Sequence, residues 1–350
     1  MDVRFSPEQL ALRDSVAQVV DRLRPRAVGE LEDSERSTKL DAAVVASGWR
    51  ELRTGDEGTA PLASGVEVGI VAEELGRGLA DSPFVGPTLA AELRRLAGAP
   101  AATSVETVLL LADLSRLAAA PGGTRSGPAV AIDAAGAECA IALVPRDGGY
   151  VLASVPIEPA PDPVDLTRPS AVPVAGGRVE ALADQSRVLT DDDVARWTAL
   201  GLATACADLV GTMRGAVELS CEYAASRQQY GSAIGSFQAV QHLLADAFVA
   251  TEGSRSAVLH ATWAVDALAP RDALVAGAVA KAYSARAARD VCETAIQVHG
   301  GIGNTWECLA HVHLRRALLS ADVLGGVGPS LQRVLAHHGI SREGADDGLR

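Results

Sequence analysis

The second half of the chain most constrains the fold, because from Thr190 to about Ala336 its pattern predicts long helices only. Thr190 precedes three aspartates, and a hydroxyl there can accept free amide protons while acids favour the positive end of a helix. Four breaks are expected to divide this stretch: Gly211, Gly231-Ser232, Pro270 and the Gly300-Gly301-Ile302-Gly303 turn. Segments of such length predict an antiparallel helical bundle.

The first hundred residues are also predicted to be helical, and a different pattern follows them. Ser6, Pro7 and Glu8 form a typical helix start, with a cap, a proline at the first position and an early acid. After about Ala97, short apolar runs such as 107–111 and 140–144 alternate with glycine-rich turns. This alternation of apolar runs with glycine-rich segments predicts strands joined by tight turns.

These patterns predict a mainly α fold with a central β domain. We expect an N-terminal helical domain over residues 1–101, a middle β domain over 102–187, a C-terminal helical bundle over 188–340 and a flexible polar tail over 341–350. Hydrophobic residues make up 48% of the chain but aromatic residues only 3%, which favours cores of Ala, Val and Leu between closely packed helices.

The charge and the cysteines exclude several functions. A net charge of -13 repels nucleic-acid phosphates and gives no surface-wide attraction for anionic lipid, so we expect neither partner. The five cysteines lack paired metal-ligand spacing and are interpreted as reduced, mostly buried thiols, with no metal site. Because no apolar signal core or membrane-spanning stretch is visible, a soluble cytoplasmic protein is predicted.

The most informative motif begins at the Arg227-Gln228-Gln229-Tyr230-Gly231 segment and continues through Phe237-Gln238 and Leu244-Ala245-Asp246. An arginine fork suits a pyrophosphate, and an adjacent glycine lets the backbone turn close to a ligand. A single Arg near a Gly is more often a solvated residue at a helix break. The longer motif, which continues through residues 237–246, favours a ligand contact instead.

A second motif is Gln297-Val298-His299-Gly300-Gly301-Ile302-Gly303, followed by Trp306-Glu307 and Arg315-Arg316. Paired glycines allow backbone amides to approach a phosphate or adenine, and Gln297 offers both a donor and an acceptor. Taken alone, the glycines would equally fit a turn that ends a helix.

In this order the motifs resemble the acyl-CoA dehydrogenase family, whose pattern has Arg-x-Gln-aromatic-Gly, then Phe-Gln, then Gln-x-x-Gly-Gly-x-Gly. The N-terminal part also resembles it, at Phe5–Gln9, Gly48–Leu52 and Val71–Arg77, so the likeness extends from about Phe5 to Arg333. The resemblance implies a β-barrel-like middle domain, a C-terminal four-helix bundle and an FAD cofactor. It implies cofactor-binding roles for Arg227, Gln229, Tyr230, Gly231, Phe237, Gln238, Gln297, Gly300 and Gly301.

The chain departs from the family where the flavin ring and the catalytic base belong. Between Thr103 and Asp184 we find neither the Thr-Glu-Pro-x-x-Gly-Ser-Asp-like segment nor the Trp-containing strand that embrace the ring. The prolines of residues 155–163 instead remove amide donors there. By spacing, the usual glutamate position falls on Leu324, and a second family position falls near Gly201, so no catalytic carboxylate is predicted.

Other ionisable residues are interpreted as structural. Asp208, Glu218 and Glu222 lie near the second base position, but charges on a long helix usually form its wet face. His299, His311 and His313 are expected to be structural or exposed, since the last two face different sides of a helix.

The resemblance therefore implies a subunit that completes the site of an unlike partner. Actinobacterial steroid side-chain dehydrogenases, used in lipid and steroid degradation, are α2β2 heterotetramers of two such chains, and the Ala- and Arg-rich composition resembles theirs. We expect a homologous partner, an acyl-CoA substrate and an electron-transfer acceptor. Two alternatives stay open: a self-sufficient homotetramer with a non-standard base, and a structural subunit without flavin.

Overall fold

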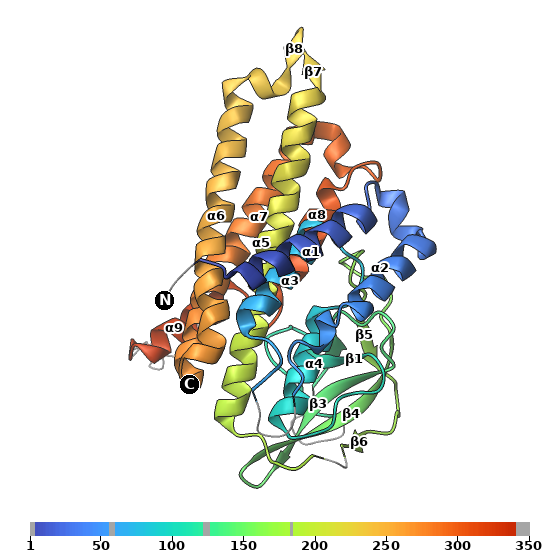
Figure 1. Cartoon of the computed structure of the whole chain (residues 1–350), viewed down its shortest axis with the longest axis vertical. Coiled ribbons are helices and arrows are strands. Elements are labelled where there is room, and N and C mark those ends of the chain that lie inside the picture. Colours follow the sequence, from blue (N-terminus) through green and yellow to red (C-terminus); the bar gives the residue numbers. More distant parts are fainter. Residues whose placement is uncertain (1–3, 56–59, 122–126, 183–184, 341–350) are drawn as a thin grey trace, which may run out of the picture.

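The computed structural model describes residues 4–55, 60–121, 127–182 and 185–340. The chain passes through helices, then strands, then longer helices (Figure 1). This order confirms the predicted mainly α fold with a central β region. The tail over 341–350 lies outside the described residues.

The N-terminal helices begin where the sequence predicts caps. Ser6 accepts a hydrogen bond from the Gln9 amide, and the Gln9 side chain returns the bond to the Ser6 amide, which forms a capping box. Ser64 and Glu67 form a second box further along. The elements are α1 (Pro7–Leu23), η1 (Val28–Glu32), α2 (Ser34–Ala46), η2 (Trp49–Glu51), α3 (Gly65–Arg77) and α4 (Val85–Leu96).

The strands form a sheet that closes on itself. Its order is β3-β1-β2-β5-β4-β6, and a further pairing between β3 and β4 joins the first strand to the fifth. The β1–β3 pair is parallel, and the other pairs are antiparallel. The strands are β1 (Glu106–Leu111), β2 (Ala129–Ala131), β3 (Cys139–Arg146), β4 (Gly149–Pro159), β5 (Ala171–Pro173) and β6 (Glu180–Ala181).

The two faces of this sheet differ in side-chain size. Successive strand residues point to opposite faces, and buried Ala140 and Ala142 alternate with the buried residues Ile141 and Leu143. The small residues belong to a cluster within the β region, whereas the larger ones pack into the main core with the helices. The alanines therefore permit tight closure, and the larger side chains attach the β region to the helices.

The helices α5, α6 and α7 are the longest elements and run side by side through most of the molecule (Figure 1). The Thr190 hydroxyl caps the first of them by accepting a hydrogen bond from the Asp193 amide, as predicted. Among the described residues, no helix is both long enough and apolar enough to cross a membrane. The elements are α5 (Asp191–Ser226), β7 (Gln228–Gln229), β8 (Ser232–Ala233), η3 (Ile234–Ser236), α6 (Gln238–Ala267), α7 (Pro270–His299), η4 (Gly300–Asn304), α8 (Ala310–Asp322) and α9 (Val327–His337).

The predicted break at Gly211 is wrong, because α5 continues through it without interruption. Gly211 instead allows α3 to pack closely against α5. A Cβ atom at this position would overlap the Glu73 carbonyl oxygen and lie 2.8 Å from the Arg77 nitrogen. The glycine serves contact between helices, and the other three predicted breaks do separate helices.

Candidate functional site

The two segments predicted to contact a cofactor lie at the same end of the bundle. Arg227 follows the last residue of α5, and Gly300 follows the last residue of α7. Tyr223 and His299 bring these helix ends together, because their rings stack with centroids 4.4 Å apart and an interplanar angle of 23°. The β7–β8 hairpin forms the tip of this end (Figure 1).

Arg227 begins a tight hairpin. Its amide donates to the Tyr223 carbonyl at 2.8 Å, and its carbonyl accepts from the Ile234 amide at 2.8 Å, so the backbone is fixed on both sides. Tyr230 and Gly231 form the turn with φ of 50° and 80°, the pair of positive values that a type I′ hairpin turn requires. Among the described residues, no hydrogen bond or ion pair engages the Arg227 guanidinium.

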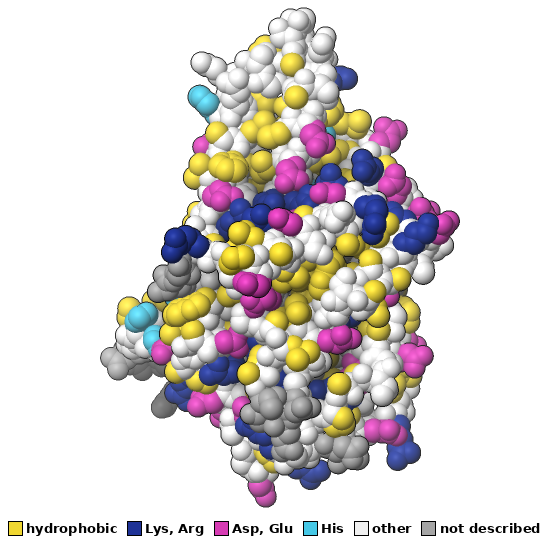
Figure 2. Space-filling model, in the orientation of Figure 1, with side chains coloured by type: hydrophobic (Ala, Val, Ile, Leu, Met, Phe, Trp, Pro, Cys, Tyr) yellow, Lys and Arg dark blue, Asp and Glu magenta, His cyan; other side chains and the backbone are white. Residues whose placement is uncertain are grey.

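The hairpin and the start of α6 are unusually poor in charge. Between Gln228 and Thr251, Asp246 is the only Asp, Glu, Lys or Arg residue. Apolar side chains are nevertheless exposed here: Tyr230 by 96%, Val249 by 66% and Phe248 by 56%. Figure 2 shows this end of the molecule covered by hydrophobic and uncharged side chains, with few charged ones.

The remaining predicted residues of the first segment follow the turn directly. Phe237 is 37% exposed, and its ring meets Tyr230 edge-on, with centroids 6.4 Å apart. Gln238 is exposed at the first position of α6, and Gln229 is exposed in β7. These side chains surround the hairpin without burying it.

The two glycines of the second segment that are predicted to bind the cofactor, Gly300 and Gly301, differ in conformation. Gly300 has φ of 65°, a left-handed conformation that a side chain would strain. Gly301 has no positive φ, and a Cβ atom built on it would find nothing within 4 Å. Gln297 is exposed on the last turn of α7. Nothing among the described residues therefore requires a glycine at position 301.

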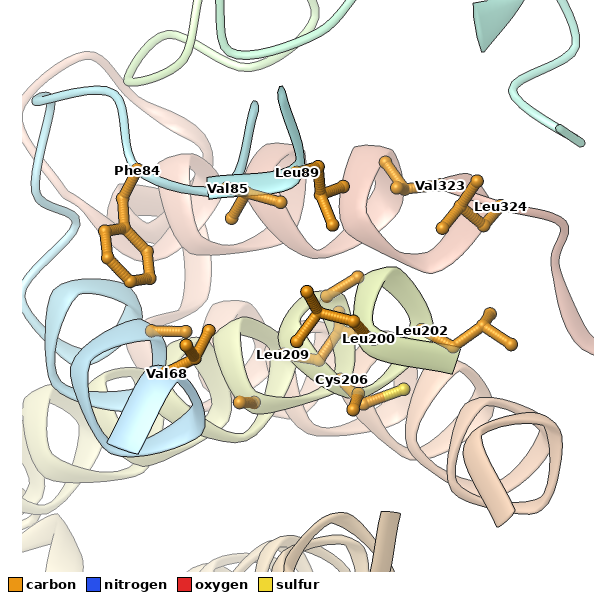
Figure 3. Packing of buried hydrophobic residues seen from close by; sticks show 14 of the residues in the cluster. Val68, Phe84, Val85, Leu89, Leu200, Leu202, Cys206, Leu209, Val323 and Leu324 are labelled. Carbon is orange, nitrogen blue, oxygen red and sulfur yellow. The ribbon is translucent and has the colours of Figure 1, made fainter. Parts of the chain in front are cut away.

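The two positions where the sequence predicts a vacant base, Gly201 and Leu324, are adjacent in space. A Cβ atom on Gly201 of α5 would overlap the Leu324 side chain and lie 3.5 Å from Leu89. Leu324 is fully buried in the loop between α8 and α9, with φ of 61°. Figure 3 shows Val323 and Leu324 facing α5, with Leu89 beside them. Aliphatic carbon thus fills the place where the two predicted base positions meet.

The end predicted to contact a cofactor lies far from the two predicted base positions. Gly201 and Ser226 lie on one uninterrupted helix, and at 1.5 Å of rise per residue they are separated by about 38 Å. An extended FAD molecule does not span that length. The hairpin residues of one chain therefore cannot serve a flavin ring beside Gly201 of the same chain.

The interpretation of Asp208 as part of a wet face is wrong, because its side chain is buried. Arg316 donates to Asp208 Oδ1 from Nη2 at 2.6 Å and from Nε at 3.0 Å. Ser320 donates to Oδ2 at 2.7 Å, and Arg168 Nη1 lies 3.2 Å from the same oxygen. Burial raises the pKa of Asp208, but Arg168 and Arg316 outweigh it and hold the pKa below its ordinary value. A carboxylate paired on both oxygens is a poor proton acceptor.

This ion cluster joins three parts of the chain. Arg168 also donates to Asp165 at 2.9 Å, so the segment after β4 is linked to α5 and α8. Arg316 Nη1 reaches the Ala80 carbonyl and the Thr167 hydroxyl, each at 2.8 Å. The cluster therefore holds the β region, the bundle and the segment after α3 in one arrangement.

The other candidates for acid–base chemistry, Glu218, Glu222 and His313, line one pocket together with Arg24 and Arg77. Glu218 lies 3.5 Å from Arg77 and is 43% exposed at its side chain, and Glu222 is exposed. His313 is buried, and its pKa is lowered to about 3, chiefly by burial and by Arg316, so it stays neutral. Within the described part of the chain, no group of three His, Cys, Asp or Glu side chains is placed to hold a metal ion.

The cysteines are free thiols, as predicted. Cys206, Cys292 and Cys308 are buried, Cys139 is half-buried and Cys221 is exposed. Burial raises the pKa of Cys206 to about 11 and that of Cys292 to about 12. Since the thiolate is the reactive form, these two core thiols are inert at neutral pH.

The chain is similar to known proteins in sequence and in fold. Residues 198–336 match the family model described as the C-terminal domain of acyl-CoA dehydrogenase. Acyl-CoA dehydrogenase IpdE2 of Mycolicibacterium smegmatis is 31% identical over 95% of this chain and 99% of its own length. Acyl-CoA dehydrogenase FadE34 of Mycobacterium tuberculosis is 36% identical over 57% of this chain, which spans only 28% of that protein. The ChsE4-ChsE5 complex from Mycobacterium tuberculosis contains a chain of the same fold, with a TM-score of 0.75, 21% identity and coverage of 97% and 100%.

Proposed function

The chain belongs to the acyl-CoA dehydrogenase family, and we propose that it is the subunit of a heteromeric enzyme that lacks the catalytic base. It contributes FAD contacts to a site whose base and flavin-ring cradle come from an unlike partner. Bound FAD supplies the hydride acceptor for α,β-dehydrogenation of an acyl-CoA thioester. The reaction also needs a group that takes the α-proton, and a carboxylate performs that role well.

The packing of Leu324 against Gly201 is the observation that carries this proposal. Neither residue can accept a proton, and the side chain of Leu324 occupies the space that Gly201 leaves open. Asp208, the buried acid on the same helix, is fully engaged by two arginines and a serine. The chain therefore offers no carboxylate at either position where the family places one.

The hairpin end fits the dinucleotide part of FAD. Arg227 is exposed and has no acidic partner among the described residues, so its guanidinium is available to a pyrophosphate. Gly301 leaves open space for a close approach of the ligand. Gln297 adds an exposed amide that can donate and accept hydrogen bonds. These residues would hold the cofactor, and none of them supplies the chemistry of its ring.

The separation of the two regions points to a cofactor shared between chains. The hairpin lies about 38 Å along α5 from Gly201, so its residues serve a ring that lies outside this chain. An identical partner would present the same Leu324 packing and could not supply the base. The partner that completes the site is therefore an unlike chain of the same fold, as in actinobacterial steroid side-chain dehydrogenases.

The surface of the hairpin end supports burial by such a partner. The first half of α6 exposes three large apolar side chains, Leu243, Phe248 and Val249, and a group of exposed apolar side chains often marks an interaction site. Depletion of charge and enrichment in aromatic residues are typical of interface cores. The single charge between Gln228 and Thr251 fits this composition.

Flavin content tests the proposal directly. We expect the chain purified alone to contain no bound FAD and to show no acyl-CoA oxidation. Co-expression with the product of an adjacent dehydrogenase-like gene is expected to give a complex with a flavin absorption band and turnover. Full flavin occupancy and turnover by the lone chain would favour a self-sufficient homotetramer, and a flavin-free complex would favour a structural subunit.

Gly301→Ala provides a test of the contact itself. In the lone chain the added methyl group meets open space, so the thermal midpoint is expected to stay unchanged. In the complex it would press against the dinucleotide, and an overpacked contact of about 1–3 kcal/mol predicts at least a roughly fivefold loss of FAD affinity. Gly328→Ala is a matched control, since it also meets open space but lies in α9, away from the hairpin (Figure 1). Equal FAD affinities for the two variants would contradict the assignment of Gly301.

A further inference from the structure

The Tyr223–His299 stack lies between the two segments assigned to FAD. Tyr223 belongs to the last turn of α5, and His299 is the last residue of α7. Their rings lie nearly parallel with centroids 4.4 Å apart, which is close to the shortest separation of favourable offset stacks. His299 is 6% exposed, and its Nδ1 lies 2.7 Å from the Ala295 carbonyl oxygen. A donated hydrogen bond to that carbonyl fixes the ring in place.

Each ring belongs to the backbone that carries one cofactor segment. The Tyr223 carbonyl accepts the hydrogen bond from the Arg227 amide at 2.8 Å, so the tyrosine and the arginine share one helical turn. His299 directly precedes Gly300, and Gly303 folds back against it, so that a Cβ atom on Gly303 would lie 3.1 Å from the His299 Cβ. A shift of either ring would therefore move the turn that carries the adjacent segment.

We propose that Tyr223 and His299 are positioning residues that set the separation between the Arg227 hairpin and the Gln297–Gly301 turn. The inference rests on the proposed function, because the two segments matter together only if one FAD molecule contacts both. Neither ring has to touch the cofactor. The stack acts by holding two short backbone segments, each at the end of a long helix, in the geometry that the dinucleotide requires.

A purely structural role for this pair would have different consequences. Below the stack, α5 and α7 already pack through buried small residues: Ala203, Cys206, Ala280 and Ala288 belong to one core cluster. The helices are thus held together without the two rings. Loss of the stack is expected to loosen only the last turns, where the FAD segments lie, and to leave global unfolding nearly unchanged.

The experiment measures FAD affinity of the co-purified complex by titrating the apo-complex with FAD. A lost aromatic stack predicts an increase in Kd of about three- to tenfold for Tyr223→Ala and for His299→Ala. The double variant is expected to match either single variant, because both changes remove one contact. Tyr223→Phe keeps the ring and is expected to retain the affinity of the unchanged chain.

Two further variants separate positioning from folding. Tyr223→Leu keeps an apolar side chain without a ring, so it tests the stack even if the alanine variant unfolds. His260→Ala removes the histidine of another ring pair, with Trp263 at 5.8 Å, on a part of α6 far from the hairpin. Its Kd for FAD is expected to stay unchanged, and the thermal midpoint is measured for every variant.

The outcomes distinguish the positioning role of Tyr223 and His299 from the proposed FAD contacts. If Tyr223 and His299 variants leave the Kd unchanged while Arg227→Ala raises it, the positioning role is overturned and the FAD assignment stands. If Arg227→Ala also leaves the Kd unchanged, the proposed function itself fails. A fall in thermal midpoint that accounts for the whole change in affinity would likewise overturn the positioning role.

Discussion

Asp208→Ala is expected to lower the free energy of unfolding by about 3–5 kcal/mol, the cost of removing one partner from a buried ion pair. The change would leave Arg316 without its carboxylate partner and Arg168 with Asp165 alone. Ser320 would also lose the acceptor of its hydroxyl proton. Chemical denaturation followed by circular dichroism measures the effect.

Two further variants make this prediction specific. Asp208→Asn keeps the shape and an acceptor for Ser320 but removes the charge, so it is expected to lose most of the same stability. Asp14→Ala removes an acid of an exposed pair with Arg13 and is expected to leave the denaturation midpoint unchanged. If Asp208→Ala and Asp14→Ala had equal midpoints, the cluster would not be a source of stability.

The stability that Asp208 contributes is expected to depend on pH. Because the pKa of Asp208 is lowered in the folded chain, its contribution is fully present above the ordinary carboxyl value of 3.8. It is lost as the pH falls through the folded pKa, where the native carboxylate is finally protonated. The difference in stability between the unchanged chain and Asp208→Asn should therefore be largest near neutral pH and shrink in strong acid.

Local sequence signals predicted the order of the elements well. The Ser6 and Thr190 caps mark the starts of α1 and α5, where the structure forms both capping boxes. The Gly231-Ser232 pair, Pro270 and the Gly300 turn separate helices as expected. Each of these signals depends on hydrogen bonds or backbone angles within a few residues, so no distant part of the chain is needed to interpret it.

The roles of Gly211 and Asp208 could not be predicted from local sequence signals, because distant segments of the chain determine them. Gly211 is required by the close approach of the α3 backbone, and Asp208 is held by arginines from the β region and α8. A signal for Asp208 was nevertheless present. It is the only Asp, Glu, Lys or Arg residue between Trp197 and Met213, and a lone charge within an apolar helical stretch predicts a buried, paired group.

The spacing of the motifs predicts where the two base positions fall, but it does not predict that they are in contact. Counting from the motifs located two positions without acids, Leu324 and the region of Gly201. It could not reveal that these positions touch, since they lie on separate elements. The contact explains why both are vacant together: a leucine side chain can fill this space only because Gly201 has no Cβ atom.

Arg227→Ala is expected to weaken FAD binding by the complex about tenfold to a hundredfold. Hydrogen bonds to a charged group contribute about 1.5–3 kcal/mol, and each 1.4 kcal/mol corresponds to a factor of ten in affinity. The guanidinium is exposed and has no partner among the described residues, so its removal should not change the stability of the lone chain. Titration of the apo-complex with FAD measures the change in Kd.

Arg227→Lys distinguishes a guanidinium fork from a simple positive charge. Lysine keeps the charge but cannot form two parallel hydrogen bonds to a phosphate, so we expect an affinity between those of the unchanged chain and Arg227→Ala. Arg271→Ala is the matched control, because Arg271 is 80% exposed at its side chain at the start of α7, the helix end opposite Gly300. An Arg227→Ala complex that binds FAD as tightly as the Arg271→Ala complex would show that this guanidinium does not hold the cofactor.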